Sequence, residues 1–318
     1  MKSLKPEFLE RMKKISSNKE DYENYLEILD KEIKRSIRCN KIKISPQELK
    51  KQLEKKSWKI SQPWPENPEV MIIESELKPG ELGKSIEHML GYYYIQELAS
   101  MLPIIALKPK KNEVILDLCA SPGSKTTQIA SEMNNTGLII ANEPKPPRIN
   151  ILSTNLERCG VSNTIITRED GIRLCEKLKQ QKIFFDKILV DAPCSGEGTL
   201  RSSPKTAIMW NPKTIIAHSK LQKKLIKSSL EILKLNGELI YSTCTHAPEE
   251  NEEIIDFLLK EFPNQIQVEK IKLPVKCRKP LNSWDKKEYQ DTENACRIHP
   301  QDNDTEGFFL VKFKKVKE

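Results

Sequence analysis

The chain has 318 residues, of which 37% are hydrophobic and 31% are charged, a composition typical of a soluble globular protein. This length suffices for one large domain and a smaller one, each with its own core. No apolar stretch reaches membrane-spanning length, and the Lys/Glu-rich amino end contains no signal core, so we expect a cytoplasmic protein that binds no membrane. The eight cysteines include no C-x-x-C pair, which argues against a metal site and against a disulfide scaffold.

The positive charge is concentrated at the amino end. The formal net charge is +8, and residues 1–60 contain 17 Lys and Arg against 10 Asp and Glu. A basic appendage on a nearly neutral body suggests a polyanionic partner, most simply nucleic acid. A charged face that only keeps the protein soluble is the alternative.

The first third of the chain is predicted to contain a small α/β unit. Helical periodicity covers residues 20–35, β-branched residues predict a strand over 36–44, and Ser45-Pro46-Gln47-Glu48 has the residues of a capping box. A short strand is expected near residues 70–74. Basic residues on this unit form a natural edge for phosphate contacts: Arg35, Arg38, Lys41 and Lys43.

A long apolar helix is predicted over residues 88–107, which include Tyr92, Tyr93 and Tyr94. We place the domain boundary just before it. The predicted organisation is therefore an amino-terminal basic domain over residues 1–86 and a larger domain over residues 87–318.

From residue 113 onward, predicted strands and helices alternate, which is the signature of a parallel sheet covered on both faces. Strands are expected near 113–119, 137–143, 164–169, 186–191 and 238–243, and helices near 124–133, 145–159, 171–181, 212–235 and 249–261. Two more strands, near 265–271 and 307–314, would complete a doubly wound α/β fold with a seven-stranded sheet. Periodicity alone does not separate a methyltransferase from a dinucleotide-binding fold.

A small-residue turn follows the first of these strands, in the segment Asp117-Leu-Cys-Ala-Ser-Pro-Gly-Ser-Lys-Thr-Thr127. Only one glycine of the dinucleotide fingerprint is present, and the glycines of a phosphate-binding P-loop are missing. A single tight glycine turn suits a cofactor with a carboxylate and no phosphate, such as S-adenosylmethionine. Glu143 and Asp170 end the next two strands, where acids can accept from ribose hydroxyls and an adenine amino group. Either acid could instead be a simple helix cap.

Two cysteines follow strand ends later in the chain. Cys194 lies in Asp191-Ala-Pro-Cys-Ser-Gly196, and Cys244 lies in Tyr241-Ser-Thr-Cys-Thr245. Because ligands of open α/β sheets bind at the carboxyl ends of the strands, these thiols are candidates for chemistry at a shared site. Two ordinary buried thiols are the alternative.

These segments, with Arg297-Ile-His-Pro300, Glu306-Gly-Phe-Phe309 and Gly91–Met101, closely resemble the Sun family of RNA cytosine carbon-5 methyltransferases, in its archaeal tRNA-type form. The resemblance covers roughly residues 35–315, with Ser121 and Ser124 where the family usually has Ala and Gly. It implies a class I methyltransferase fold with a small RNA-recognition-like domain in front. It also implies that S-adenosylmethionine is bound by Cys119, Ala120, Ser121, Pro122, Gly123, Ser124, Lys125, Glu143, Arg148, Asp170 and Asp191.

The resemblance also implies catalytic roles. Cys244 would attack carbon 6 of the cytosine, Cys194 would assist release of the product, and Asp191 would hold the cytosine edge. Lys125 would polarise the ring or orient Asp191. DNA cytosine methyltransferases suggest the opposite assignment, because they attack with a thiol placed like that of Cys194.

The expected partner is RNA, most simply tRNA, and the expected state is a monomer. A ribosomal RNA substrate, a non-catalytic RNA-binding protein on the same scaffold and a small-molecule methyltransferase are the alternatives. Arg201, Lys205 and Lys213 are further candidates for phosphate contacts. Trp210 is expected to anchor a helix rather than to stack on a base. The remaining cysteines have no expected role: Cys39, Cys159, Cys175, Cys277 and Cys296.

Overall fold

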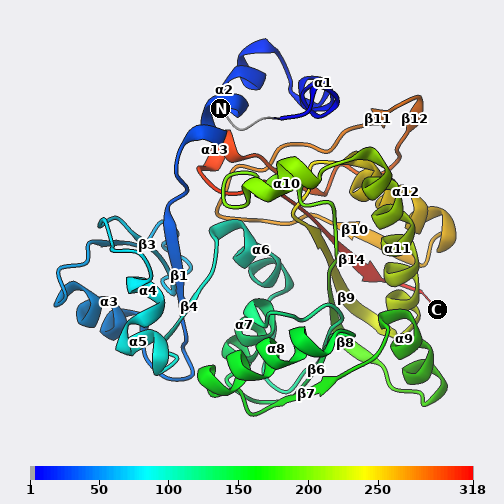
Figure 1. The fold of residues 1–318 in the computed structure, drawn as a ribbon. Coiled ribbons are helices and arrows are strands. Elements are labelled where there is room, and N and C mark those ends of the chain that lie inside the picture. The colour runs from blue at the N-terminus through cyan, green and yellow to red at the C-terminus, as the bar shows by residue number, and fades with distance from the viewer. Residues whose placement is uncertain (1–3, 318) are drawn as a thin grey trace. The chain divides into compact units, whose positions relative to one another are not determined.

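The computed structural model describes residues 4–317, and its internal contacts divide the chain into two units. Unit 1 consists of Met1–Ile33, Val190–Glu231 and Leu235–Glu318, and unit 2 of Lys34–Leu189 and Ile232–Lys234. Figure 1 shows the elements of both. The domain boundary near residue 86 stays a prediction. Among the described residues, no helix has the length and apolarity needed to cross a bilayer.

Unit 2 begins with a four-stranded antiparallel sheet in the order β2-β3-β1-β4. Its strands are β1 (Arg35–Cys39), β2 (Ile60–Ser61), β3 (Val70–Ile73) and β4 (Tyr93–Ile95), and its helices are α3 (Pro46–Glu54), α4 (Glu81–Lys84) and α5 (Ile86–Met89). The predicted cap is present, since the Ser45 side chain accepts from the amide of Glu48. Leu49, Leu53 and Trp58 belong to the core beneath this sheet.

The predicted helix over residues 88–107 is wrong in its first half. The short helix α5 ends at Met89, Tyr93–Ile95 forms β4, which pairs with β1, and the helix resumes only at Leu98–Leu107, as α6. Gly91 accounts for the break. Its φ is +72°, and a Cβ at this position would lie 1.9 Å from the carbonyl oxygen of Arg158. A helix cannot continue through such a residue.

The remainder of unit 2 is the parallel half of the main sheet. β5 (Val114–Asp117) pairs in parallel with β6 (Leu138–Asn142) and with β8 (Phe185–Asp191), and β6 pairs with β7 (Thr164–Thr167). The connecting helices are α7 (Ser124–Glu132), α8 (Pro146–Cys159) and α9 (Gly171–Gln180). The strand order therefore reverses at β5, which is the topological switch point of doubly wound folds.

Unit 1 contains the antiparallel half of the same sheet. β9 (Leu233–Thr243) pairs with β14 (Phe308–Lys315), which also pairs with β10 (Ile266–Glu269) and β13 (Cys296–Ile298). A bond from the amide of Ala192 to the carbonyl of Ser242 places the end of β8 beside β9. The order β10-β14-β9-β8-β5-β6-β7 contains the seven expected strands, with β13 as an eighth. The alternating α/β fold is thus confirmed.

The other elements of unit 1 surround these strands. They are α10 (Pro204–Met209), α11 (Pro212–Glu231), α12 (Glu252–Glu261), α13 (Pro300–Asn303), the 3-10 turns Glu197–Thr199 and Pro248–Glu250, and the hairpin of β11 (Ser283–Trp284) and β12 (Lys287–Glu288). The amino-terminal helices α1 (Pro6–Ile15) and α2 (Lys19–Asp30) also belong here. Phe8 and Tyr25 pack in one apolar cluster with Trp210 and Ala247.

Candidate functional site

The two cysteines predicted at strand ends lie together. Cys194 follows β8 and Cys244 follows β9, and their Sγ atoms are 3.3 Å apart. Both side chains are half-buried. Both thiols therefore lie at the carboxyl ends of adjacent strands, where ligands of this fold bind.

The hydrogen bond with Cys244 and burial raise the pKa of the Cys194 thiol well above its ordinary value of 9.0. The nearby carboxylate of Glu250 acts in the same direction. Cys194 therefore keeps its proton at neutral pH, within hydrogen-bond distance of the other sulfur. Because only a thiolate is a strong nucleophile, the raised pKa disfavours attack by Cys194 itself.

Asp191 ends β8 three residues before Cys194, and its Oδ1 accepts from the Ser242 hydroxyl at 2.7 Å. Ser242 comes from the neighbouring strand β9, so the carboxylate is fixed between the strand ends that carry the cysteines. This carboxylate is half-buried and can accept from a further donor, since two oxygens offer about four acceptor positions.

A buried glutamate holds the loop that carries Cys194. Both carboxylate oxygens of Glu250 face the backbone amide of Ser195, at 3.1 and 3.4 Å, and Gln222 donates to one of them at 2.8 Å. Gln222 also donates to the carbonyl of Pro193 at 2.9 Å. The residues on each side of Cys194 are therefore fixed by the same pair of side chains. Burial raises the pKa of Glu250 to about 7.

A second buried glutamate connects the two cysteine segments. The Thr245 hydroxyl lies 2.8 Å from the Ser195 hydroxyl and donates to Glu197 at 3.1 Å. Trp210 donates its indole N–H to the same carboxylate at 2.7 Å and is only 4% exposed. Trp210 is thus packed and hydrogen-bonded inside unit 1, in the anchoring role expected for it.

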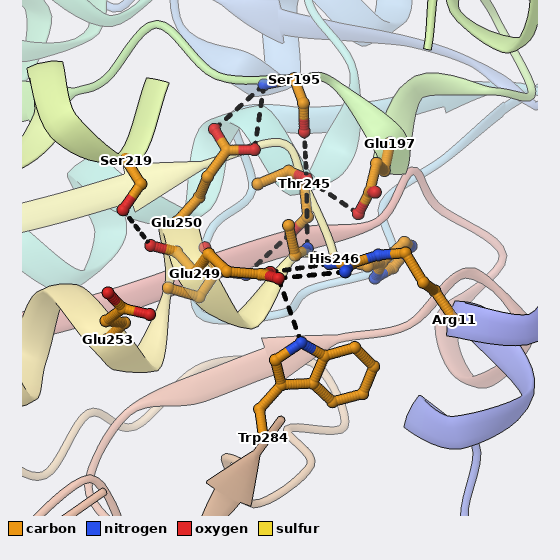
Figure 2. Close-up of polar contacts among 12 residues, drawn as sticks. Arg11, Ser195, Glu197, Ser219, Thr245, His246, Glu249, Glu250, Glu253 and Trp284 are labelled. Atoms are coloured by element: carbon orange, nitrogen blue, oxygen red, sulfur yellow. Dashed lines mark hydrogen bonds and ion pairs between the residues drawn. The ribbon is translucent and has the colours of Figure 1, made fainter. Parts of the chain in front are cut away.

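The sequence did not suggest a role for Arg11, which lies in α1. Its guanidinium donates two bonds to the carboxylate of Glu249, at 3.0 and 2.7 Å, and covers the ring of Trp284 at 5.0 Å. Trp284 donates to the same carboxylate, and Ser219 donates to its backbone carbonyl. Figure 2 shows these contacts beside the Glu250 and Thr245 bonds. Part of the basic front end therefore supports the cysteine site.

In unit 2, the predicted cofactor loop connects β5 to α7. Gly123 is the N-cap of α7 with a φ of +102°, and the amide of Ala120 donates to the carbonyl of Asn142 at 2.9 Å. The peptide bond between Ser121 and Pro122 is cis. Cys119 is half-buried in this loop. A glycine with this φ gives the tight turn and exposed backbone that close approach of a ligand requires.

Glu143 and Arg148 lie against this loop. Glu143 is 3% exposed at the end of β6 and forms an ion pair with the Arg148 Nε at 3.3 Å. Arg148 donates to the carbonyl of Ser121 at 2.8 Å and accepts from its hydroxyl through its own carbonyl at 3.0 Å. The donor set fits an adenosyl cofactor: an acid for ribose hydroxyls beside a turn without a pyrophosphate cradle.

Two other predicted residues have contacts of their own in unit 2. Asp170 caps α9, with Oδ1 accepting from the amides of Ile172 and Arg173. The exposed carboxylate has a second oxygen that can accept from a ligand. Lys125 is buried, and its Nζ donates to the Ser100 hydroxyl at 3.1 Å.

Two arginines expected to contact phosphate are buried instead. Arg38 is 2% exposed and donates to the carbonyl of Ser124 and the hydroxyl of Thr127, so it supports the loop from behind. Arg201 is 7% exposed and donates to the carbonyl of Thr305 and to Asp304. Both predictions are wrong, because buried arginines cannot contact phosphate. The sequence could not show this, since the acceptors of these arginines are distant in the chain.

Cys277 and Cys296, for which no role was expected, form a disulfide. Their separation of 19 residues gave no recognisable spacing signal. Within residues 4–317, no group of three or more His, Cys, Asp or Glu side chains could hold a metal ion.

The chain matches known proteins over its whole length. Residues 104–314 match the family model of the 16S rRNA methyltransferase RsmB/F, and residues 4–98 match the N-terminal domain of the 16S rRNA methyltransferase RsmF. The tRNA (cytosine(49)-C(5))-methyltransferase of Pyrococcus abyssi is 41% identical over 99% of this chain and 97% of its own length. The ribosomal RNA small subunit methyltransferase F of Pectobacterium carotovorum is 36% identical, and the match covers 99% of this chain but 63% of that protein.

Solved structures of other proteins superpose on this chain. NSun6 from Pyrococcus horikoshii with SFG superposes with a TM-score of 0.85 at 25% identity, over 100% of both chains. A methyltransferase homolog from the same organism gives 0.80 at 32% identity, over 98% of this chain and 100% of that one. The chain therefore belongs to the RsmB/F family of S-adenosylmethionine-dependent methyltransferases.

Proposed function

We propose that this enzyme methylates carbon 5 of a cytosine in RNA, most simply in tRNA, through a covalent adduct with Cys244. The pair of sulfurs 3.3 Å apart at the ends of β8 and β9 carries the proposal. The Pyrococcus abyssi relative, named for carbon 5 of a tRNA cytosine, supports the substrate. The monomeric state and the cytoplasmic location stay predictions.

The chemistry explains why a thiol is needed. Carbon 5 of cytosine is a poor nucleophile, and attack of a thiolate on carbon 6 forms a C–S bond and shifts an electron pair to carbon 5. When bound, S-adenosylmethionine would supply the methyl group that carbon 5 takes and would leave as S-adenosylhomocysteine. Loss of the carbon-5 proton to a base and departure of the sulfur from carbon 6 restore the aromatic ring.

In this scheme Cys244 is the nucleophile, and the protonated Cys194 beside it takes part in the elimination that releases the product. Asp191, held by Ser242, contacts the ring nitrogen and amino group of the cytosine. Lys125 polarises the ring or orients that carboxylate. The target base has to be unpaired or flipped out of its stack to reach these groups.

Transfer of a labelled methyl group to bulk tRNA tests the activity. We expect Cys244→Ala to abolish turnover, because no C–S bond can form. Cys194→Ala should instead accumulate an RNA–protein adduct that survives a denaturing gel, because release is impaired. An adduct in the Cys244→Ala variant and none in the Cys194→Ala variant would reverse the assignment.

A 16S ribosomal RNA substrate is the second candidate, since the RsmF relatives are named for it. This chain spans only 63% and 58% of those two proteins. Methylation of a tRNA transcript and of isolated small ribosomal subunits by the same preparation separates the two. Bisulfite sequencing of the methylated RNA then identifies the cytosine.

A further inference from the structure

A basic cavity of about 450 Å³ lies at one end of the small antiparallel sheet in unit 2. It is open to solvent and lies between the end of α3 and the turn that leads into α4. Residues that line it include Lys56, Trp58, Lys78, Glu81, Lys84 and Ser85. We call it the lysine cavity.

The wall of the lysine cavity is fixed by hydrogen bonds. Trp58 is 5% exposed and donates its indole N–H to Glu81 at 3.2 Å, and the other oxygen of Glu81 accepts from the amide of Lys78 at 2.8 Å. The turn passes through Gly80, whose φ is +78°. Lys78 and Lys84 therefore project from a defined turn, with the one acid of the wall already bonded on both oxygens.

The ammonium groups of the cavity have few partners. Lys56 pairs with Glu87, whereas Lys78 and Lys84 form no ion pair with any residue in the range 4–317. Both are exposed. The cavity lining contains three lysines and one glutamate, and Glu87 pairs with one of these lysines, which leaves an excess of one positive charge. An uncompensated positive charge of this kind attracts a polyanion.

The edge on which the sequence suggested phosphate contacts has fewer exposed, unpaired basic groups. Arg38 is buried, Lys41 pairs with Glu132, and Lys43 donates to the carbonyls of Leu90 and Arg158. Arg35 is exposed and donates to the carbonyl of Leu77, so the exposed basic groups in this part of unit 2 include Arg35 as well as the lysines of the cavity.

We propose that the lysine cavity binds backbone phosphate of the substrate RNA, with Lys78 and Lys84 as the contacts; this rests on the proposed function. Lysine ammonium groups act as point charges on phosphate oxygens, and such contacts carry no base sequence information. Trp58 is only 5% exposed, so its ring offers no surface on which a base could stack. Binding here raises affinity for RNA without touching the reacting base.

The double variant Lys78→Ala/Lys84→Ala tests this, with Lys110→Ala/Lys111→Ala as control. Those two lysines are also exposed, form no ion pair within residues 4–317, and give the same charge change. We expect KM for a tRNA transcript to rise about tenfold near 0.15 M salt, with kcat unchanged at saturating RNA. The slope of log affinity against log salt should fall by about 1.5, roughly 0.7–0.9 for each of the two lost contacts. The control should keep the slope of the wild type.

Equal KM and salt slope in the test and control variants would overturn the inference. So would a test variant that loses binding only to phosphatidylserine vesicles, or only to inorganic phosphate, and keeps its affinity for RNA. Failure of the proposed function is a separate outcome, because the wild-type enzyme itself would then transfer no methyl group to RNA.

Discussion

Both carboxylate oxygens of Glu250 face the backbone amide of Ser195, the residue that follows Cys194. The acid comes from the turn after β9, so it links the segment of one cysteine to the loop of the other. Precise placement of reacting groups is worth large rate factors, and a shift of one ångström can cost about a hundredfold. We therefore expect Glu250 to act as a positioning residue for the proposed thiol chemistry.

Replacement of Glu250 tests this role. We expect Glu250→Ala to lower kcat by roughly 10- to 100-fold, because the Ser195 amide loses its acceptor and the Cys194 loop loosens. Glu250→Gln keeps one acceptor oxygen and should restore most of the rate. The affinity for S-adenosylmethionine, measured by titration calorimetry, should stay unchanged in both variants. Equal loss in the two variants would instead point to the charge of the acid.

The pH dependence of stability tests the pKa of Glu250 independently of the kinetics. Burial raises its pKa from 4.5 to about 7, so over this range the folded state holds more protons than the unfolded state. The free energy of unfolding then falls as pH rises, by roughly 3 kcal/mol in total for this group. Burial lowers the pKa of His246 from 6.5 to about 3, and this group has the opposite effect between those values.

Glu250→Gln should therefore remove the fall in unfolding free energy that Glu250 causes as pH rises. The rise that His246 causes should remain. We expect the free energy of unfolding of the variant, relative to that of the wild type, to be about 2–3 kcal/mol higher at pH 8 than at pH 5. Urea denaturation at both pH values measures the difference. Parallel pH profiles for the two proteins would show that the acid titrates normally in the fold.

The sequence predicted the parallel strands, because buried strands have short apolar runs. It also predicted that the two thiols meet, because each follows the carboxyl end of a strand. Prediction from the sequence failed for side chains whose partners are distant in the chain. Arg38 and Arg201 look like phosphate ligands in the sequence, but the fold supplies them with acceptors up to 169 residues away. Arg11 and Glu249 are separated by 238 residues, so neither side chain gave a local signal. Gly91 ended a helix whose apolar pattern continued through it.

Arg11 should be the charged residue of α1 on which stability depends most. Its two bonds to Glu249 are mostly shielded from solvent, with side chains 17% and 14% exposed. Arg11→Ala leaves that carboxylate with the weaker donor Trp284, and we expect a loss of about 2 kcal/mol. Lys14→Ala, an exposed change on the same helix, should cost less than about 0.5 kcal/mol. Similar values from denaturant titration would refute a special role for Arg11.

The disulfide between Cys277 and Cys296 should add measurable stability. Closing a loop with a sequence separation of 19 restricts the unfolded chain by about 3 kcal/mol in the chain-entropy model. We expect a reducing agent to lower the denaturation midpoint of the wild type but not that of a Cys277→Ser/Cys296→Ser variant. A midpoint insensitive to reductant in both proteins would mean that the bond does not form in solution.

Gly123 should control cofactor affinity. Its φ of +102° is strained for any side chain, and a Cβ there would lie 3.1 Å from the Leu152 Cδ1. Gly123→Ala therefore has to distort the loop between β5 and α7, at a cost of about 1–3 kcal/mol. Gly83→Ala is the matched control, because its φ is ordinary and the nearest atom lies at 4.0 Å. We expect calorimetry to show at least about fivefold weaker binding of S-adenosylmethionine to Gly123→Ala and wild-type binding to Gly83→Ala. Unchanged binding to both variants would exclude the loop from the cofactor site.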